Sequence, residues 1–142
     1  MQLTQAYYLH AALNYRLFNG ELEPAIIKTF DFDDNQNDDM IEAKTETELD
    51  PFLIFVSEQI LKGDPLYFAT VLLHEMIHQY NRQIGVDDTE PYTGKHTADF
   101  VKAATDHGLM QSGYKLTPET EQLITDLLKK YELIATLEMN FN

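Results

Sequence analysis

The amino-acid sequence predicts an α+β fold in one domain that spans residues 1–142, and three observations support this prediction. Apolar residues recur every three or four positions over residues 2–18 and 65–83, which is the period of a helix packed against a core. Two short apolar runs, 25–32 and 52–56, are rich in Ile, Phe and Val and are too short for a stable helix, so they indicate strands. The length and the 44% hydrophobic content suit one domain with one core.

The N-terminal half is expected to supply one helix and a small three-stranded sheet. The helix covers residues 2–18 and ends just before Gly20, a residue typical of helix C-termini. The first strand covers residues 25–32. Residues 40–49 alternate in part between apolar and polar side chains, as a strand with one solvated face does. Residues 52–56 form a continuous apolar run that predicts a buried third strand.

A central helix is expected between Pro65 and Gln83. Asp64 can cap its first turn, Pro65 suits its first position, and Gly85 lies just beyond its end. Apolar residues occur on more than one side of this helix, as expected of an element in the middle of a core.

Further helices are expected in the C-terminal part of the chain. A polar loop at 86–94 leads to a helix over residues 97–107, and residues 109–115 form a short connection with room for an extended piece. The last helix follows the cap Thr117 and runs to about Glu138.

The central helix contains the motif His-Glu-x-x-His. His74 and His78 are four residues apart and therefore lie on one face of the helix, where two imidazoles can hold one zinc ion. Glu75 projects about a quarter-turn from His74 and can reach a metal-bound water without binding the metal. The alternative is a pair of buried histidines that are satisfied by hydrogen bonds. The specificity of the motif favours the metal site.

A catalytic zinc site needs a third protein ligand, and the chain has no cysteine to provide one. The collagenase-like pattern is excluded, because it needs Gly and His where the chain has Asn81 and Ile84. His96 is the best candidate, since it follows a glycine-containing loop and precedes a helix that can fix it. Glu90 and Asp99 are the alternatives to it. The full set of downstream candidates is Asp87, Asp88, Glu90, His96, Asp99 and His107.

Three segments resemble the signature of the SprT-like zinc metalloprotease family. The first is residues 13–22 (LNYRLFNGEL), the second is residues 73–78 (LHEMIH), and the third is residues 94–100 (GKHTADF). They occur in the order and at the spacing of that family, and together they span about residues 13–108.

The resemblance implies a zincin-like domain in which His74, His78 and His96 bind Zn²⁺. The expected activity is that of a zinc-dependent metalloendopeptidase, which hydrolyses peptide bonds with a zinc-activated water and with Glu75 as general base. One alternative is a catalytically weak or inactive zinc-binding module of the same fold that acts in interaction or regulation, and another is a non-peptidase metal hydrolase. The candidates for stabilising the oxyanion, which the sequence does not rank, are Tyr80, Tyr92 and Lys95.

Charge and composition restrict the partners. The net charge of −14 favours solubility and repels nucleic acid and anionic membranes. Direct DNA binding is therefore not expected from the charge, although the resemblance keeps it open, because DNA-dependent activity is known in that family. The expected partner is a protein or peptide, aligned as an extended chain along a strand edge of residues 40–49 or 52–56. No apolar run approaches the ~20 residues of a membrane span and no secretion signal is visible, so a cytoplasmic location is expected.

Three other features have ordinary explanations. Residues 31–42 place oxygen-bearing side chains at the spacing of a calcium loop, but Gln36 stands where that loop needs glycine, so an exposed acidic turn is the preferred interpretation. His10 is expected to be a surface or half-buried side chain of the first helix. His107 is expected to interact with the C-terminal end of its helix.

Overall fold

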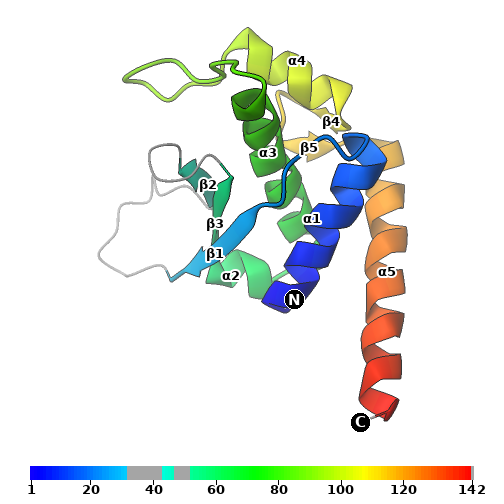
Figure 1. Cartoon of the computed structure of the whole chain (residues 1–142). Helices are drawn as coiled ribbons and strands as arrows, with labels where there is room; N and C mark the ends of the chain where they lie inside the picture. The colour runs from blue at the N-terminus through cyan, green and yellow to red at the C-terminus, as the bar shows by residue number, and fades with distance from the viewer. Residues whose placement is uncertain (32–42, 47–51, 142) are drawn as a thin grey trace.

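The computed structural model describes residues 1–31, 43–46 and 52–141 of the chain. Within these ranges the protein has a mixed α+β fold with five helices, one three-stranded sheet and one two-stranded sheet, which confirms the predicted α+β class (Figure 1). Helix α3 (Pro65–Gln83) lies in the middle, with the larger sheet on one side and α5 (Pro118–Phe141) on the other. The single domain over the whole chain stays a prediction.

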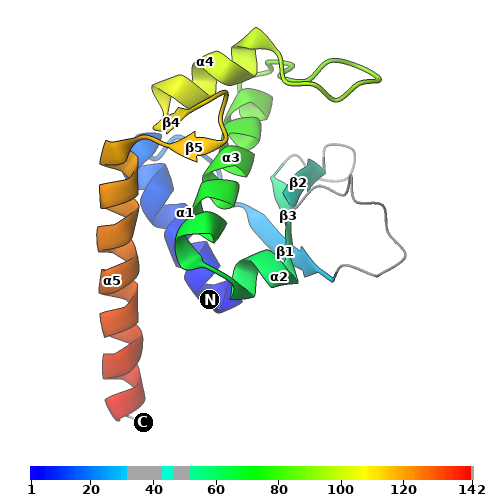
Figure 2. The ribbon, with the colours of Figure 1, turned by 180° about the vertical axis from the view of Figure 1, so that it is seen from behind.

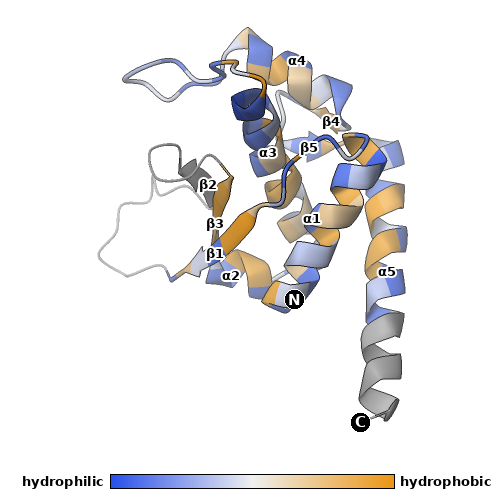
Figure 3. Cartoon of the chain, in the orientation of Figure 1, coloured by the Kyte–Doolittle hydropathy of each residue, from blue (hydrophilic) through white to orange (hydrophobic). Residues whose placement is uncertain are grey.

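The three-stranded sheet contains β1 (Ile26–Phe30), β2 (Ala43–Glu46) and β3 (Leu53–Ser57) in the order β1-β3-β2. β3 is the central strand and runs parallel to β1 and antiparallel to β2. Its side chains are mostly buried, as its continuous apolar run predicted (Figure 3). The three expected strands are confirmed where the chain is described, and the ends of the expected strand at 40–49 lie outside the described residues.

Helix α1 (Leu3–Leu17) closes the outer edge of β1. The Ile26 N–H bonds inward to the carbonyl of Phe52 at 3.0 Å, so the backbone of Ile27 faces the other way, towards α1. There the Tyr7 hydroxyl accepts from the Ile27 N–H at 2.9 Å and donates to the Ile27 carbonyl at 3.2 Å. One phenol therefore satisfies both backbone groups that Ile27 turns to the outer edge of β1.

Helix α2 (Glu58–Lys62) differs from the prediction, which has no element between the third strand and the break at Gly63. A segment of this length is too short for its helical period to be recognised in the sequence. In the structure it connects the end of β3 to the start of α3, and its Leu61 is buried in the core.

Helix α3 begins as the sequence predicts. The Asp64 side chain accepts a hydrogen bond from the Tyr67 N–H at 3.2 Å, and Pro65 takes the first helical position. The C-terminal turns are polar (Figure 3), whereas the preceding turns supply the centre of the core. The fully buried side chains of α3 include Phe68, Leu72, Leu73, Met76 and Ile77.

The chain after α3 returns over the C-terminal half of that helix. A loop at 84–97 leads to α4 (Ala98–Asp106), and a hairpin of β4 (Leu109–Met110) and β5 (Lys115–Leu116) follows. The Thr117 hydroxyl then caps α5, as predicted. Seen from behind, α4 and the hairpin lie at the end of the molecule where α3 terminates, and α5 runs beside α1 (Figure 2).

His10 on α1 is buried, so the expectation of a surface or half-buried side chain is wrong. The residue is 4% exposed, and its Nε2 lies 2.9 Å from Oε1 of Gln79 on α3. The Gln79 amide donates to the carbonyl of Glu23 at 2.8 Å, so this polar contact joins α1 and the turn that follows it to α3. Burial lowers the pKa of His10, and the Gln79 bond only partly offsets this effect.

Two further expectations concern parts of the chain that the structure describes only in part. Among the described residues, none of the helices combines the length and the apolar composition that a bilayer span requires. The calcium-loop pattern over 31–42 lies outside the described residues apart from Asp31, so the exposed acidic turn stays a prediction.

Candidate metal centre

His74 and His78 come from the C-terminal half of α3 and face α4. They are one helical turn apart, and their ring centroids are separated by 5.2 Å. Phe100 of α4 packs against both rings. Because the buried residues of α3 form the centre of the core, the two histidines are carried by a rigid element.

His96 reaches the same place from the loop between α3 and α4. The loop folds back on itself, and Thr89 and His96 form an isolated antiparallel bridge across its base. The His96 ring centroid then lies 5.0 Å from that of His74 and 5.1 Å from that of His78. The structure therefore brings together the three histidines that the sequence analysis selected.

The three histidines can hold one metal ion. Each offers one ring nitrogen, and the three nitrogens lie within 4.8 Å of one another. Around a tetrahedral zinc ion, with Zn–N distances of about 2.0–2.1 Å, imidazole centroids stand roughly 5 Å apart. The observed separations of 5.0, 5.1 and 5.2 Å agree with that geometry. Within the described residues no Asp or Glu side chain joins this group, and the geometry does not identify the metal.

Asp88 holds His78 in its orientation. Its Oδ2 lies 2.8 Å from Nδ1 of His78 and accepts a second hydrogen bond, at 3.0 Å, from Nδ2 of Asn81. Burial raises the pKa of the Asp88 carboxyl, but the contacts with His78 and Asn81 outweigh burial and the pKa lies below its ordinary value. The ionised carboxylate accepts the Nδ1–H of His78, which leaves Nε2 for a metal. The sequence analysis considered Asp88 only as a ligand, and the structure gives it this supporting role.

Phe100 forms an apolar wall beside all three imidazoles. It is fully buried, and its ring centroid lies 3.9–4.9 Å from those of the histidines. Burial lowers the pKa of His74 to about 4, against the smaller effect of its bond to Gly113. Burial also lowers the pKa of His96, with a further contribution from His78. Metal ions bind neutral imidazole, so these shifts favour coordination at neutral pH.

The β4–β5 hairpin contributes two residues that the sequence analysis missed. The carbonyl of Gly113 lies 2.9 Å from Nδ1 of His74. The Tyr114 ring lies 5.0 Å from that of His74, and its hydroxyl is 3.4 Å from Nδ1 of His96. The sequence shows only a turn signal at Ser112, and such a signal does not reveal what the turn residues face.

The other downstream candidates lie outside the histidine group. Asp87, Glu90 and Asp99 are exposed. His107 follows the last turn of α4, and its Nδ1 lies 2.6 Å from the carbonyl of Ala103, so the predicted interaction with the end of the helix is confirmed.

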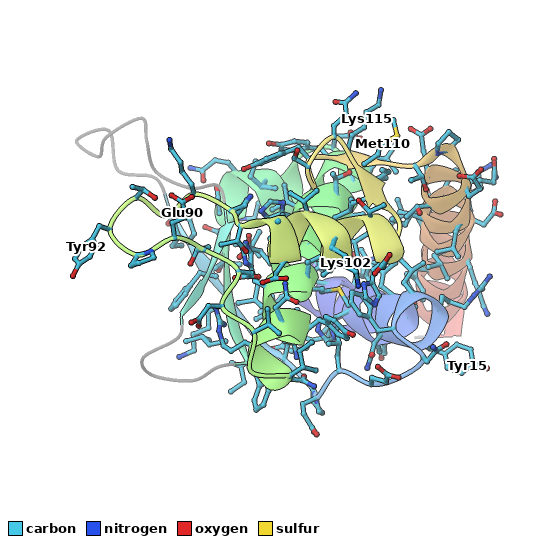
Figure 4. All side chains as sticks on the ribbon, turned by 90° about the horizontal axis from the view of Figure 1, so that it is seen from above. Tyr15, Glu90, Tyr92, Lys102, Met110 and Lys115 are labelled. Atoms are coloured by element: carbon cyan, nitrogen blue, oxygen red, sulfur yellow. The ribbon has the colours of Figure 1, made fainter. Side chains whose placement is uncertain are left out.

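The structure places the three oxyanion candidates taken from the sequence in different surroundings. Tyr92 is fully exposed at the tip of the loop and points into solvent (Figure 4). The Tyr80 ring packs against Phe18 and His107, with centroid distances of 5.9 and 4.6 Å, on a different face of α3. Lys95 is exposed on the loop.

Glu75 follows His74 on α3 and is 3% exposed. Helix geometry places its side chain about 100° round from that of His74. A carboxylate buried to this degree is uncommon, and such groups are most often paired or functional. Glu75 is therefore buried on the helix that carries His74 and His78, and its role as a general base stays a prediction.

Comparison of the chain with known protein families, with curated proteins and with solved structures gave no match. The resemblance to the SprT-like family therefore remains an expectation from the sequence. The mixed α+β fold and the convergence of three histidines are observations of the structure itself.

Proposed function

We propose that the chain is a zinc-dependent metalloendopeptidase of the SprT-like, zincin type, which hydrolyses peptide bonds with Glu75 as general base. The observation that carries this proposal is the convergence of His74, His78 and His96 beside the helix that also bears Glu75. The ligands come from two separate elements, and their spacing suits tetrahedral coordination. The resemblance of residues 13–108 to the family signature supports the same assignment.

Zinc is the metal that this ligand set favours. Imidazole nitrogens suit zinc, and three protein ligands leave one tetrahedral position open, as in catalytic zinc sites. When bound, zinc supplies Lewis-acid polarisation of a carbonyl and a water of lowered pKa. The residues that would hold it are His74, His78 and His96.

Glu75 is the proposed proton carrier. Its carboxylate accepts a proton from the attacking water and returns it to the amine of the leaving peptide. Its burial excludes bulk water from the carboxylate, which strengthens its interactions with charge that develops during the reaction.

The outer strand β2 is the proposed guide for the substrate. The sequence left both β2 and β3 open for this role, but β3 is the central strand and has no free edge, so that part of the expectation is wrong. Tyr7 satisfies the outer backbone groups of Ile27 on β1. Among the described residues β2 pairs with β3 alone, and it lies against α3, so an extended peptide can add to its outer edge.

The charge of the chain favours a peptide over a nucleic acid. A net charge of −14 attracts basic segments and repels phosphates. The proposed substrate is therefore a neutral or basic protein segment, and DNA-dependent activity is kept as a question for the assay. The cytoplasmic location stays a prediction from the sequence.

The proposal is tested by metal analysis combined with a cleavage assay. The purified chain is expected to bind one zinc ion, to cleave casein or histones, and to lose cleavage when a chelator removes the metal. Glu75→Gln is expected to keep the zinc and to lower hydrolysis by about 10²–10⁴-fold, the usual contribution of a general base. Glu90→Gln makes the same change at an exposed loop position, and it should alter neither zinc content nor cleavage.

The outcomes separate the candidate functions. A zinc-loaded wild-type chain that cleaves neither substrate, with or without DNA, contradicts the peptidase and favours the interaction or regulatory module. Full hydrolysis by Glu75→Gln would remove Glu75 from the mechanism. Loss of zinc in Glu75→Gln would make Glu75 a ligand rather than a base.

A further inference from the structure

The turn between β4 and β5 has an uncommon backbone conformation. Gln111, Ser112 and Gly113 are consecutive and all have positive φ, at 52°, 58° and 93°. Residues other than glycine rarely adopt this region, and where they do the surrounding structure fixes them, often beside a binding site. Met110 and Lys115, which flank the turn, point away from the body of the protein (Figure 4). The contacts that hold the turn in this conformation are therefore on the side that faces α4 and His74.

Gly113 approaches α4 more closely than a residue with a side chain could. A Cβ atom at this position would lie 2.6 Å from Cε1 of Phe100 and 3.5 Å from Cβ of Ala104. The close approach places the Gly113 carbonyl 2.9 Å from Nδ1 of His74. A carbonyl only accepts, so His74 donates from Nδ1 and keeps the Nε2 lone pair free.

Tyr114 extends the same arrangement to the ligand on the loop. Its ring centroid lies 5.0 Å from that of His74 and 5.7 Å from that of His96, and its hydroxyl is 3.4 Å from Nδ1 of His96. The residue is 66% exposed, so burial in the core does not account for its position over the two rings. Asp88 contacts Nδ1 of His78, so every histidine of the group has a protein partner at Nδ1.

We propose that the β4–β5 hairpin positions the metal ligands: the Gly113 carbonyl sets the tautomer and orientation of His74, and the Tyr114 hydroxyl accepts from the Nδ1–H of His96 and orients that ring. Both are positioning residues, because they act through the histidines. A proton on Nδ1 leaves Nε2 for the metal in each ring. The hairpin thereby joins a ligand on α3 to a ligand on the loop. This inference rests on the metal site of the proposed function and is independent of peptide hydrolysis.

The Tyr114 contact is tested by Tyr114→Phe in the full-length chain. Long-range ¹H–¹⁵N NMR spectra of the histidine rings report the tautomer of each imidazole, and competition with a chromogenic chelator reports zinc affinity. In the wild type His96 is expected to carry its proton on Nδ1. Tyr114→Phe should give His96 a mixture of tautomers, leave His78 unchanged and weaken zinc binding about 10-fold, the lower end of the range for such partners.

A matched control separates this effect from the loss of any hydroxyl. Tyr15 on α1 is 75% exposed and lies on the far side of the molecule from the loop tip at Tyr92 (Figure 4). Tyr15→Phe should therefore change neither the tautomers nor the zinc affinity. Urea unfolding of the metal-free protein should be the same for Tyr114→Phe, Tyr15→Phe and the wild type.

The Gly113 contact is tested by Gly113→Ala, with Gly20→Ala as its control. Both glycines have positive φ, but a Cβ at Gly20 would meet nothing within 4 Å, whereas one at Gly113 would meet Phe100. Gly113→Ala is expected to displace the carbonyl from His74 and to weaken zinc binding about 100-fold, the upper end of the same range. Gly20→Ala should leave zinc affinity unchanged.

Three results would overturn the inference. The first is a Tyr114→Phe chain with wild-type zinc affinity and an unchanged His96 tautomer. The second is a Tyr114→Phe chain with slower hydrolysis at unchanged zinc affinity, because Tyr114 would then act on the substrate directly. The third is a wild-type chain that binds no metal. A chain that binds zinc and cleaves nothing contradicts only the proposed function.

Discussion

Helix α3 and the loop and hairpin that cover it build one site in two different ways. α3 presents His74 and His78 through regular helical spacing, on a helix whose remaining faces form the core. The loop places His96 through its bridge with Thr89 and through local backbone hydrogen bonds on either side of it, from the Thr97 N–H to the Asp88 carbonyl at 2.9 Å and from the Glu90 N–H to the Lys95 carbonyl at 2.7 Å. A bound metal ion would join a helix that is packed in the core to a mostly exposed loop that is held by local hydrogen bonds. We therefore expect metal binding to stabilise the loop more than the helix.

The largest expected effect comes from removing one ligand from each region. His78→Ala and His96→Ala should each weaken zinc binding by more than about 100-fold, beyond the range seen for residues that only support a ligand. The metal-free proteins should differ. His78→Ala leaves Asp88 buried without its histidine and should cost about 1.5–3 kcal/mol of unfolding free energy in urea, whereas His96→Ala, in the half-buried loop position, should cost less than about 1 kcal/mol.

Two outcomes would contradict this comparison. Full zinc stoichiometry in His96→Ala would remove His96 from the ligand set. Equal losses of stability in the two metal-free variants would show that the loop is as firmly held as the helix.

A second effect concerns the pH dependence of the metal-free protein. The pKa of His74 is lowered to about 4 by burial, whereas an unfolded histidine titrates near 6.5. Between these pH values the unfolded chain binds a proton at His74 that the folded chain does not. The contribution of His74 to the free energy of unfolding is therefore fully present above about pH 6.5 and is lost as the pH falls towards 4. His74 contributes roughly 3 kcal/mol to this decrease.

Urea unfolding of chelator-treated protein between pH 4.5 and 7.5 measures the pH effect. The lowered pKa values of His10 and His96 act in the same direction. His74→Gln should flatten the pH dependence more than His96→Gln, because the ring on the helix is the more deeply buried of the two. A flat profile in the wild type would contradict the burial of the histidines.

The smallest expected effect comes from Asp88, the loop residue that contacts His78 on α3. Asp88→Asn keeps the shape of the side chain but removes the charge that orients His78, and it should weaken zinc binding about 10–100-fold. Asp87→Asn makes the same change at the exposed neighbouring position and should have no effect on zinc affinity. Equal zinc affinities in the two variants would show that Asp88 does not support the ligand.

The same contrast explains what could be read from the sequence. The bounds of α3 follow from the local signals of Asp64 and Pro65 and from its apolar period, and the positions of His74 and His78 on one face follow from helical geometry. Strands β1 and β3 were recognisable from short apolar runs, and β2 from the partial alternation of residues 40–49. These predictions needed no knowledge of contacts between distant residues.

The features that the sequence did not predict depend on contacts between residues that are far apart in the chain. Gly113 and His74 are 39 residues apart in the chain, and His10 and Gln79 are 69 apart. No local sequence pattern therefore predicts the Gly113 carbonyl beside His74 or the burial of His10. Asp88 was recognised as a candidate, but its role depends on which nitrogen of His78 it faces. Helix α2 is too short for its period to be seen.

The phenol of Tyr7 has a consequence for self-association. An exposed strand edge is a template on which further chains can pair, and a sheet that is open at both edges can grow into a fibre. Tyr7 occupies the outward N–H and carbonyl of Ile27, so the edge of β1 is blocked at its second residue. If two copies of the chain paired through β2, the outer strands of the combined sheet would be the two β1 strands, each with Ile27 already bonded to Tyr7. Tyr7 therefore opposes further growth of such a sheet beyond a pair of chains.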